Sequence, residues 1–297
     1  MKYYQMYGLV VCSTFPIPEA LEIAPCDDYD VYVEMGAPPK EDLDAAKAGK
    51  ICRLEKEICW FYLQDLGLFY VEQGSHVIIW RESELLTELS KNSYLTGTVM
   101  GLLMFQREIL PIHSSAVSKD GKAILVVGDS GAGKSTNCMK LREKGCLFMS
   151  DDVSAVTIEG EQVMVSPAFP QQKLCRDAAL RQGYDLDDLI YIDENRDKYA
   201  VRLKEGYEKE ALPMGMIVEL IPTDEKEVTV HELRGLDKLS LLYRNIYRGY
   251  ALNAIGISMN VQSNILKIAE KIPMYQIVRP KRGFHSETIA DWILQNL

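Results

Sequence analysis

Short runs of β-branched and aromatic residues alternate with Gly, Pro and Asp through the first hundred residues of the chain. This pattern is typical of strands joined by turns. It predicts strands at 8–12, 31–33, 59–63 and 77–80. A turn at Pro38-Pro39, followed by 40–42, leads into the segment 43–47. We therefore predict a β-rich N-terminal part over residues 1–94.

The hydrophobic pattern changes near Tyr94. From Leu95 to Leu110, apolar residues recur mostly at spacings of three and four, which indicates a helix face packed in a core. Strand-like and helix-like segments then alternate to the C-terminus. They predict a hairpin of strands 215–222 and 228–230, a helix over 236–252, a strand at 274–278 and a C-terminal helix through Trp292. We assign residues 95–297 to a second domain, which gives an α/β (α+β) protein.

Composition and charge exclude several classes of protein. The 297 residues are 47% hydrophobic and 26% charged, which is ordinary for a globular chain and excludes a disordered one. The net charge of −10 argues against a nucleic-acid partner, because binding phosphates requires clustered Lys and Arg. No apolar run approaches the roughly 18 residues of a membrane span, and the N-terminus lacks signal-peptide features. The seven cysteines form no CxxC pair, so we expect reduced thiols in a cytoplasmic protein.

Residues 123–136 carry the clearest chemical motif. Their sequence, AILVVGDSGAGKST, contains a complete GxxxxGK[ST] phosphate-binding loop. A β-favouring run precedes the loop, and a helix is predicted to continue over 137–144 and to end at Gly145. Loop glycines allow backbone N–H groups to approach a phosphate, and the helix dipole favours the same anion. The sequence therefore predicts a nucleotide site at this loop.

Each residue of the loop is assigned to that site. The nucleotide-binding residues are Gly128, Asp129, Ser130, Gly131, Ala132, Gly133, Lys134, Ser135 and Thr136. Lys134 is expected to reach the β- and γ-phosphates of ATP, and the Ser135 hydroxyl to ligate Mg²⁺.

A pair of carboxylates, Asp151 and Asp152, follows a short apolar strand 17 residues after Lys134. This separation fits one helix, one turn and one strand, which in a right-handed βαβ unit return to the same edge of a parallel sheet. Adjacent residues on extended chain point to opposite faces. One carboxylate is then free to serve Mg²⁺ while the other approaches an acceptor hydroxyl. We expect Asp152 to bind the metal and Asp151 to act as the base, with the reverse order left open.

One histidine and a group of basic residues complete the candidates. His113 lies in the run 110–117, which precedes the loop strand by one hairpin with its turn at 119–122. A histidine on a strand beside the loop can orient an aspartate. Basic residues follow later in this acidic chain, and any of them can hold a phosphate or stay in solvent. They are Lys173, Arg176, Lys198 and Arg202, and near the C-terminus Arg279, Lys281 and Arg282.

Taken together, the HSSAV run, the loop and the strand that ends in the Asp pair resemble HPr kinase/phosphorylase. They are most similar to the HPr-kinase-related proteins of peptide-modification gene clusters, including the lasso-peptide kinases. The close likeness covers 110–156, and weaker likeness extends to 167–174, 197–199 and 7–9.

The resemblance implies a P-loop kinase core of the type shared with phosphoenolpyruvate carboxykinase. It implies phosphoryl transfer from ATP to a serine-type hydroxyl, with the Asp pair supplying metal contact and base and His113 behind it. Lys198 is the preferred basic residue, because its Asp-Lys-Tyr setting recurs in the family.

The chain also departs from this family. Thr136 stands where HPr kinases have Glu, which leaves the family's phosphorylase activity open. The family's signature segment does not follow the Asp pair, and the similar Glu232–Leu236 comes far too late in the chain. We therefore do not expect HPr itself to be the acceptor.

These observations favour an ATP- and Mg²⁺-dependent kinase that acts on a serine-type hydroxyl of a peptide or protein. The N-terminal part, by its position, is expected to help recognise the acceptor. A kinase for free serine or a polyol and a non-catalytic nucleotide-binding module remain as alternatives. The 17-residue gap argues against an NTPase switch or motor. Neither a membrane partner nor a particular oligomeric state is predicted.

Overall fold

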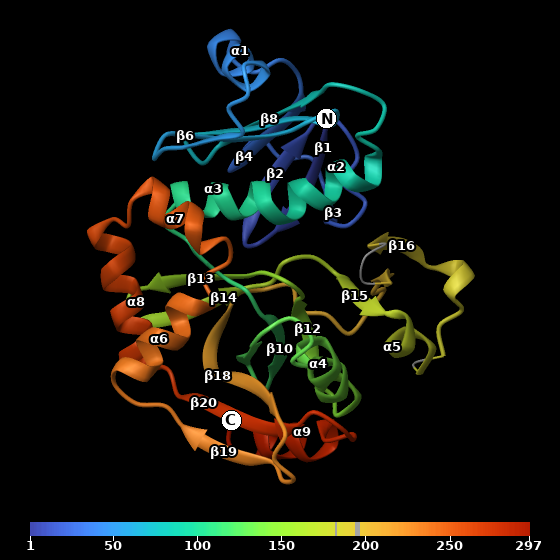
Figure 1. The fold of residues 1–297 in the computed structure, drawn as a ribbon, viewed down its shortest axis with the longest axis vertical. Helices are drawn as coiled ribbons and strands as arrows, with labels where there is room; N and C mark the ends of the chain where they lie inside the picture. Colours follow the sequence, from blue (N-terminus) through green and yellow to red (C-terminus); the bar gives the residue numbers. More distant parts are fainter. Residues whose placement is uncertain (182, 194–196) are drawn as a thin grey trace. The chain divides into compact units, whose positions relative to one another are not determined.

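The computed structural model describes residues 1–181, 183–193 and 197–297, and it has a mixed α/β architecture (Figure 1). The chain forms two compact units. The first unit comprises Met1–Pro111 and Tyr247–Gln262, and the second comprises Ile112–Ile246 and Ser263–Leu297. In the described part of the chain, no helix combines the length and apolar character needed to cross a bilayer.

The first unit contains an eight-stranded sheet in the order β3-β1-β2-β4-β8-β7-β6-β5. Its strands are β1 (Lys2–Met6), β2 (Leu9–Ser13), β3 (Leu21–Ile23), β4 (Val31–Met35), β5 (Cys52–Leu54), β6 (Ile58–Leu63), β7 (Gly67–Glu72) and β8 (His76–Arg81). Its helical segments are α1 (Lys40–Lys47), α2 (Glu88–Tyr94), the π-helical η1 (Leu95–Val99), α3 (Met100–Gln106) and α7 (Gly249–Ile255).

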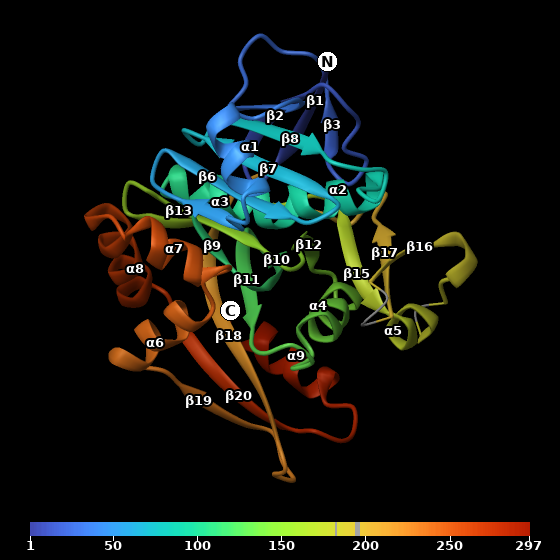
Figure 2. The same ribbon diagram turned by 45° about the horizontal axis from the view of Figure 1, so that its top comes forward.

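Helices cover this sheet on both faces, which explains the unbroken buried run of β7 (Figure 2). On one face, Leu68 and Tyr70 of β7 cluster with Ala46 of α1. On the other, the ring of Phe69 lies 5.3 Å from that of Tyr94 at the end of α2. Successive side chains of a strand point to opposite faces, so each face needs its own apolar set.

The compact units do not divide the chain at residue 94. The helical residues 95–106, which we place at the start of the second domain, belong to the first unit, and so does the returning segment Tyr247–Gln262. The division into functional domains at 94 stays a prediction.

The second unit is built on a mixed sheet in the order β12-β10-β11-β18-β14-β13, and β20 pairs with both β18 and β19. Its strands are β10 (Ser115–Lys119), β11 (Lys122–Val127), β12 (Leu147–Ser150), β13 (Ser154–Glu159), β14 (Gln162–Ser166), β18 (Leu212–Thr223), β19 (Thr229–Glu232) and β20 (Met274–Pro280). The short β9 (Leu110–Ile112) spans the point where the chain passes between units.

A separate small sheet has the order β15-β17-β16. It consists of β15 (Gln171–Cys175), β17 (Lys198–Arg202) and β16 (Ile190–Asp193). The remaining helices are α4 (Lys134–Glu143), α5 (Arg176–Arg181), the 3-10 segment η2 (Leu186–Asp188), α6 (Leu236–Arg244), α8 (Met259–Lys271) and α9 (Ser286–Gln295).

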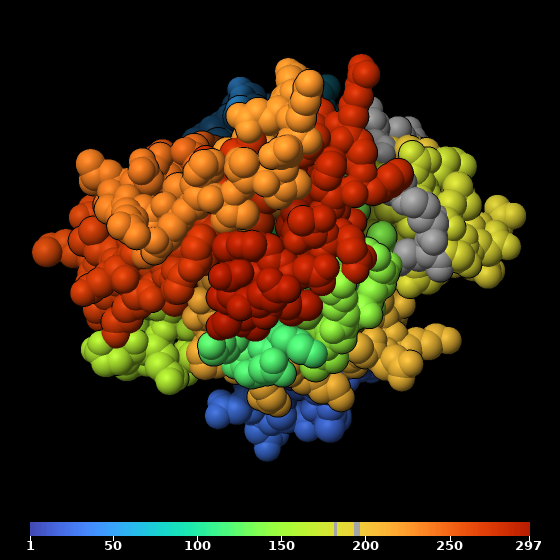
Figure 3. Space-filling model, turned by 90° about the horizontal axis from the view of Figure 1, so that it is seen from below, coloured from blue at the N-terminus to red at the C-terminus, as the bar shows by residue number. Residues whose placement is uncertain are grey.

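Helices α4 and α9 pack on one face of the second unit's sheet. Leu141 of α4 and Ile289 of α9 share a fully buried cluster with Val126 of β11. Lys144, directly after α4, pairs with Glu287 and with Asp291 of α9, the latter at 2.7 Å. Figure 3 shows the C-terminal segment (red) against the green segment that contains α4. This packing fixes the helix that follows the phosphate-binding loop.

Three expectations about pairing and helices need correction. Strands β18 and β19 do not form a hairpin, because β20 lies between them, parallel to β18 and antiparallel to β19. The predicted helix over 236–252 is two helices. Ile246 interrupts them by bridging to Ile112, and Arg248 has a left-handed φ of +53°. Finally, the sheet is not parallel between β11 and β12, because β10 lies between them and pairs antiparallel with both.

Candidate active site

The phosphate-binding loop connects the end of β11 to the start of α4, as the sequence predicts. Gly128 has φ +134°, and a Cβ there would lie 2.7 Å from the carbonyl oxygen of Leu220 on the neighbouring strand. Gly133, directly before α4, has φ +102°. Residues with a side chain rarely adopt these backbone conformations, so both positions require glycine. The loop therefore brings its backbone close to β18 and to the N-terminus of α4.

The ammonium group of Lys134 reaches back across this loop. Its Nζ donates hydrogen bonds to the carbonyl oxygens of Gly128, at 2.6 Å, and Asp129, at 3.3 Å. Burial lowers the pKa of Lys134, although the carboxylates of Asp151 and Asp152 act in the opposite direction. The loop thus holds a cation where the sequence places the terminal phosphates.

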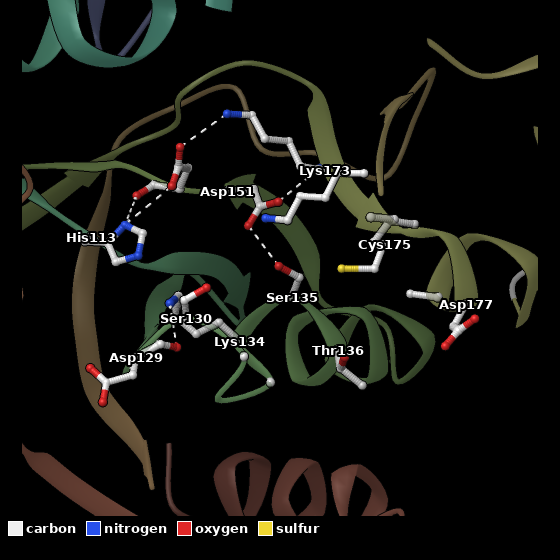
Figure 4. A pocket seen from close by; sticks show the side chains of 16 residues that line it. His113, Asp129, Ser130, Lys134, Ser135, Thr136, Asp151, Lys173, Cys175 and Asp177 are labelled. Carbon is white, nitrogen blue, oxygen red and sulfur yellow. Dashed lines mark hydrogen bonds and ion pairs between the residues drawn. The ribbon is translucent and has the colours of Figure 1, made fainter. Parts of the chain in front are cut away.

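Asp151, directly after β12, is held by three donors. Its Oδ1 accepts hydrogen bonds from the hydroxyls of Ser115, at 2.7 Å, and Ser135, at 3.2 Å. Its Oδ2 accepts one from the backbone N–H of Lys173, at 2.9 Å. Figure 4 shows Ser135 pointing from α4 toward Asp151. This carboxylate is fixed beside the residue predicted to bind Mg²⁺.

Asp152 turns to a different set of partners. Its φ of +80° is unusual for a residue other than glycine. One oxygen lies 3.2 Å from Lys173 Nζ, and the other lies 3.4 Å from Nδ1 of His113. Burial acts to raise the pKa of Asp152, but the charges of Lys173 and His113 outweigh it and lower the pKa. The group is therefore a carboxylate at neutral pH.

His113 lies in the break between β9 and β10, and not on a strand as expected. Its backbone N–H donates to the carbonyl oxygen of Asn245 at 2.7 Å, and its Nδ1 lies 2.9 Å from the carbonyl oxygen of Asp152. Burial and the nearby Lys134 lower the pKa of His113, while Asp152 acts to raise it. A neutral ring that donates from Nδ1 satisfies this geometry.

These groups line one hollow of about 460 Å³. It brings together every predicted site residue except Gly128 and Ala132. Gly128 contributes its carbonyl oxygen to Lys134, and Ala132 is buried at 1% exposure.

The other basic residues lie in different settings. Lys173 lines the hollow as Lys198 does, whereas Arg176 pairs with Asp197 and also donates to Tyr199. From the sequence, Lys173 was one of several basic residues able to hold a phosphate, its contact with Asp152 was not predicted, and Ser115 was not singled out. The two adjacent serines of the HSSAV run were the feature of the sequence that could have indicated hydrogen bonds to the Asp pair and its neighbours. Ser115 contacts Asp151, and Ser114 contacts Ser154 at 2.7 Å.

The oxygen donors fit a magnesium ion that is bound together with a nucleotide. Mg²⁺ commonly binds through one or two carboxylates plus substrate phosphates. The Ser135 hydroxyl and the Asp151 carboxylate are hard oxygen donors 3.2 Å apart. Among the residues that the structure describes, no group of three or more His, Cys, Asp or Glu side chains is arranged to hold a metal alone.

Comparisons with known proteins agree with the resemblance noted in the sequence. No protein-family model matches the chain. The HPr kinase/phosphorylase of Mycoplasmopsis pulmonis (strain UAB CTIP) is 37% identical over 68 residues, which are 22% of this chain and 22% of that protein. The predicted relationship to HPr kinase is confirmed over that segment, which spans about a fifth of the curated relative.

Among solved structures, the HPr(Ser) kinase/phosphatase of Coxiella burnetii matches 63% of this chain and 94% of its own. The sequence identity is 12% and the TM-score is 0.32, so this likeness carries no further argument. The α/β class and the strand–loop–helix order are instead read directly from the elements described above.

The electrostatics of His113 generate a first prediction. Its imidazole should titrate below the ordinary value of about 6.5. Removing the opposing charge in Asp152→Asn should lower the pKa further, and removing the cation in Lys134→Met should raise it. Proton NMR of the imidazole Cε1–H measures each midpoint, and His113→Asn identifies the signal. A midpoint that rises in Asp152→Asn would contradict the assigned contacts.

Proposed function

We propose that the protein transfers the γ-phosphoryl group of ATP, in the presence of Mg²⁺, to a serine-type hydroxyl of a peptide or protein. The observation that carries this proposal is the single hollow in which the phosphate loop, Lys134 and a hydrogen-bonded Ser135–Asp151 pair face a second, separately held carboxylate, Asp152. The printed name of the M. pulmonis relative, HPr kinase/phosphorylase, supports the reaction class.

In this proposal the loop and Lys134 hold the phosphates, and Ser135 with Asp151 holds Mg²⁺. The metal would supply neutralisation of phosphate charge. The base is then Asp152, which reverses the order expected from the sequence. The roles are assigned from the contacts of each carboxylate. Asp151 accepts a hydrogen bond from Ser135, the other residue proposed to bind Mg²⁺, whereas Asp152 lies beside His113 and Lys173.

The proposed transfer follows from these positions. The acceptor hydroxyl oxygen forms a bond to the γ-phosphorus, the bond from that phosphorus to the β–γ bridging oxygen breaks, and ADP leaves. Asp152 takes the hydroxyl proton, while His113 and Lys173 keep its carboxylate oriented. Lys134 and the loop amides neutralise charge on the phosphates, so most of the rate enhancement is positioning and electrostatics.

We propose that the nucleoside of ATP lies on the side of the loop opposite the Asp pair. A second hollow, about 230 Å³, shares Gly131, Gly133 and Thr136 with the first and is also lined by Phe284. The Phe284 side chain is 83% exposed. Exposed aromatic rings stack on nucleobases. With the terminal phosphate near the Asp pair, the base of ATP is proposed to lie against Phe284.

A cytoplasmic location and the role of residues 1–94 in acceptor recognition belong to the same proposal. All seven cysteines are free thiols, which supports a reducing compartment. Small-molecule hydroxyl kinases and nucleotide-binding modules are distinguished by the experiments below.

A direct transfer assay tests the proposed function. Incubation with γ-labelled ATP, Mg²⁺ and a library of serine-containing peptides should yield labelled phosphoserine. Lys134→Ala should lower the yield by about 100-fold or more, because the phosphates lose their cation. Label that appears on free serine or a polyol would support the small-molecule alternative. Label found only in free phosphate would contradict the kinase.

The two carboxylates should respond differently to substitution. Asp152→Asn should lower kcat by roughly 10²- to 10⁴-fold, as expected for a general base, with little change in ATP affinity. Asp151→Asn should raise the Mg²⁺ concentration needed for half-maximal rate, and added Mg²⁺ should partly restore turnover. Steady-state kinetics over a Mg²⁺ series separates the two. The opposite pattern would return the roles to the order expected from the sequence.

The position of the nucleobase of ATP is tested by comparing the binding of ATP with that of tripolyphosphate. Phe284→Ala should weaken ATP binding by roughly 5- to 100-fold, through loss of stacking, and leave tripolyphosphate binding unchanged. Isothermal titration calorimetry measures both. Leu236→Ala is the matched control, because Leu236 is a similarly exposed apolar residue on α6. If Phe284→Ala lowered the affinity for ATP and for tripolyphosphate equally, the nucleobase would not lie against Phe284.

A further inference from the structure

An arginine at the carboxyl end of β20 contacts the backbone of the phosphate loop. Arg279 donates from Nε, at 2.9 Å, and from Nη2, at 2.8 Å, to the carbonyl oxygen of Ala132. Its Nη1 donates to the carbonyl oxygen of Pro280 at 2.9 Å. Within the described residues, no carboxylate lies within ion-pair distance of this guanidinium. Arg279 therefore donates to the loop from two of its three nitrogens, and no carboxylate of the described residues pairs with its charge there.

Fixing one carbonyl also fixes the amide next to it. A trans peptide unit is planar, so its C=O and N–H point in opposite directions. The described chain has no cis peptide bond. With the Ala132 carbonyl held toward Arg279, the Gly133 N–H points away from Arg279. Arg279 lines the second hollow and not the one with the Asp pair, whereas Gly133 lines both. The Gly133 N–H thus points away from the guanidinium, and Gly133 is part of the lining of the hollow with the Asp pair.

The next peptide unit is fixed in a similar way. The Gly133 carbonyl oxygen accepts from the backbone N–H and the side-chain Nδ2 of Asn137, both at 2.9 Å. Arg279 and Asn137 therefore fix the two peptide planes on either side of Gly133. Gly133 has φ +102°. Glycine has more backbone freedom than any other amino acid, so contacts from other residues are needed to hold its peptide groups in one orientation.

We propose that Arg279 is a positioning residue of the phosphate site. It orients the Ala132–Gly133 peptide so that the Gly133 N–H is aimed at the phosphates before the nucleotide binds, and it adds a positive charge behind the loop. This inference rests on the proposed binding of ATP. Arg279 touches the loop rather than the reacting atoms, so its effect should appear in phosphate affinity and not in the base step.

Binding measurements on purified full chain test this role. Arg279→Met should weaken binding of ATP and of tripolyphosphate alike, by about 10- to 100-fold, as expected for loss of charged hydrogen bonds. Arg279→Lys keeps the charge but not the planar fork, so we expect an intermediate loss. Arg282→Met is the matched control, because it removes the same charge from an exposed position three residues along. It should bind both ligands like the wild type.

Two further measurements separate positioning from a merely structural role. Added methylguanidine should restore part of the tripolyphosphate affinity of Arg279→Ala, since the small guanidinium replaces the lost donors. The unfolding temperature without ligand shows whether each variant is folded, and Arg279→Lys serves if the Met or Ala chain is not.

The outcomes are distinct for the two claims. Tripolyphosphate affinity within twofold of wild type in folded Arg279→Met and Arg279→Lys would overturn the positioning role and leave the kinase proposal standing. An equal loss in Arg282→Met would also overturn it, because charge alone would then explain the effect. A wild-type chain that binds neither ligand would overturn the proposed function and this inference with it.

Discussion

The carboxylate of Asp151 connects the parts from which the candidate site is made. Its three hydrogen bonds come from β10, from the helix that follows the phosphate loop and from the backbone of β15. These segments are far apart in the chain. A half-buried carboxylate without donors is costly, so the three bonds both stabilise Asp151 and hold the strands in register around the loop. The geometry of Lys134, Ser135 and Asp152 depends on this junction.

Only some of the charges in the hollow are paired before an anion enters. Asp152 is compensated by Lys173, and Lys134 is neutralised only by dipoles, since its ammonium donates to two carbonyl oxygens of its own loop. The burial that lowers the pKa of Lys134 shows that this cation is poorly solvated. A polyphosphate would supply the missing counter-charge. Among the described residues that line the hollow, Lys134 and Lys198 are the lysines without an ion pair to a carboxylate, so both are available to an entering anion.

The sequence was a good guide where structure is local. The loop from Gly128 to Lys134 follows from glycine conformations and an adjacent strand and helix, and all were found as predicted. The 17-residue spacing correctly brought Asp151 to the loop. The roles of the two carboxylates were not predictable, because they depend on the positive φ of Asp152 and on partners from β10 and β15. For the same reason, the strand predicted at 274–278 was not placed between β18 and β19. Its place depends on long-range pairing, which hydrophobic patterns do not encode.

The phosphate-binding loop and the rest of the site differ in how much of each a short match to a relative can cover. The phosphate-binding loop with its flanking strand is one continuous segment at 123–136. The groups that would face the acceptor under the proposed function are His113, Asp152, Lys173 and Lys198, which come from separate elements. The distance from His113 to Lys198 in the chain exceeds the 68 residues shared with the M. pulmonis protein, so that likeness does not cover the whole site. Under the proposed function, β15, β17 and α5 are therefore the elements in which side chains of the hollow should be changed to alter acceptor specificity.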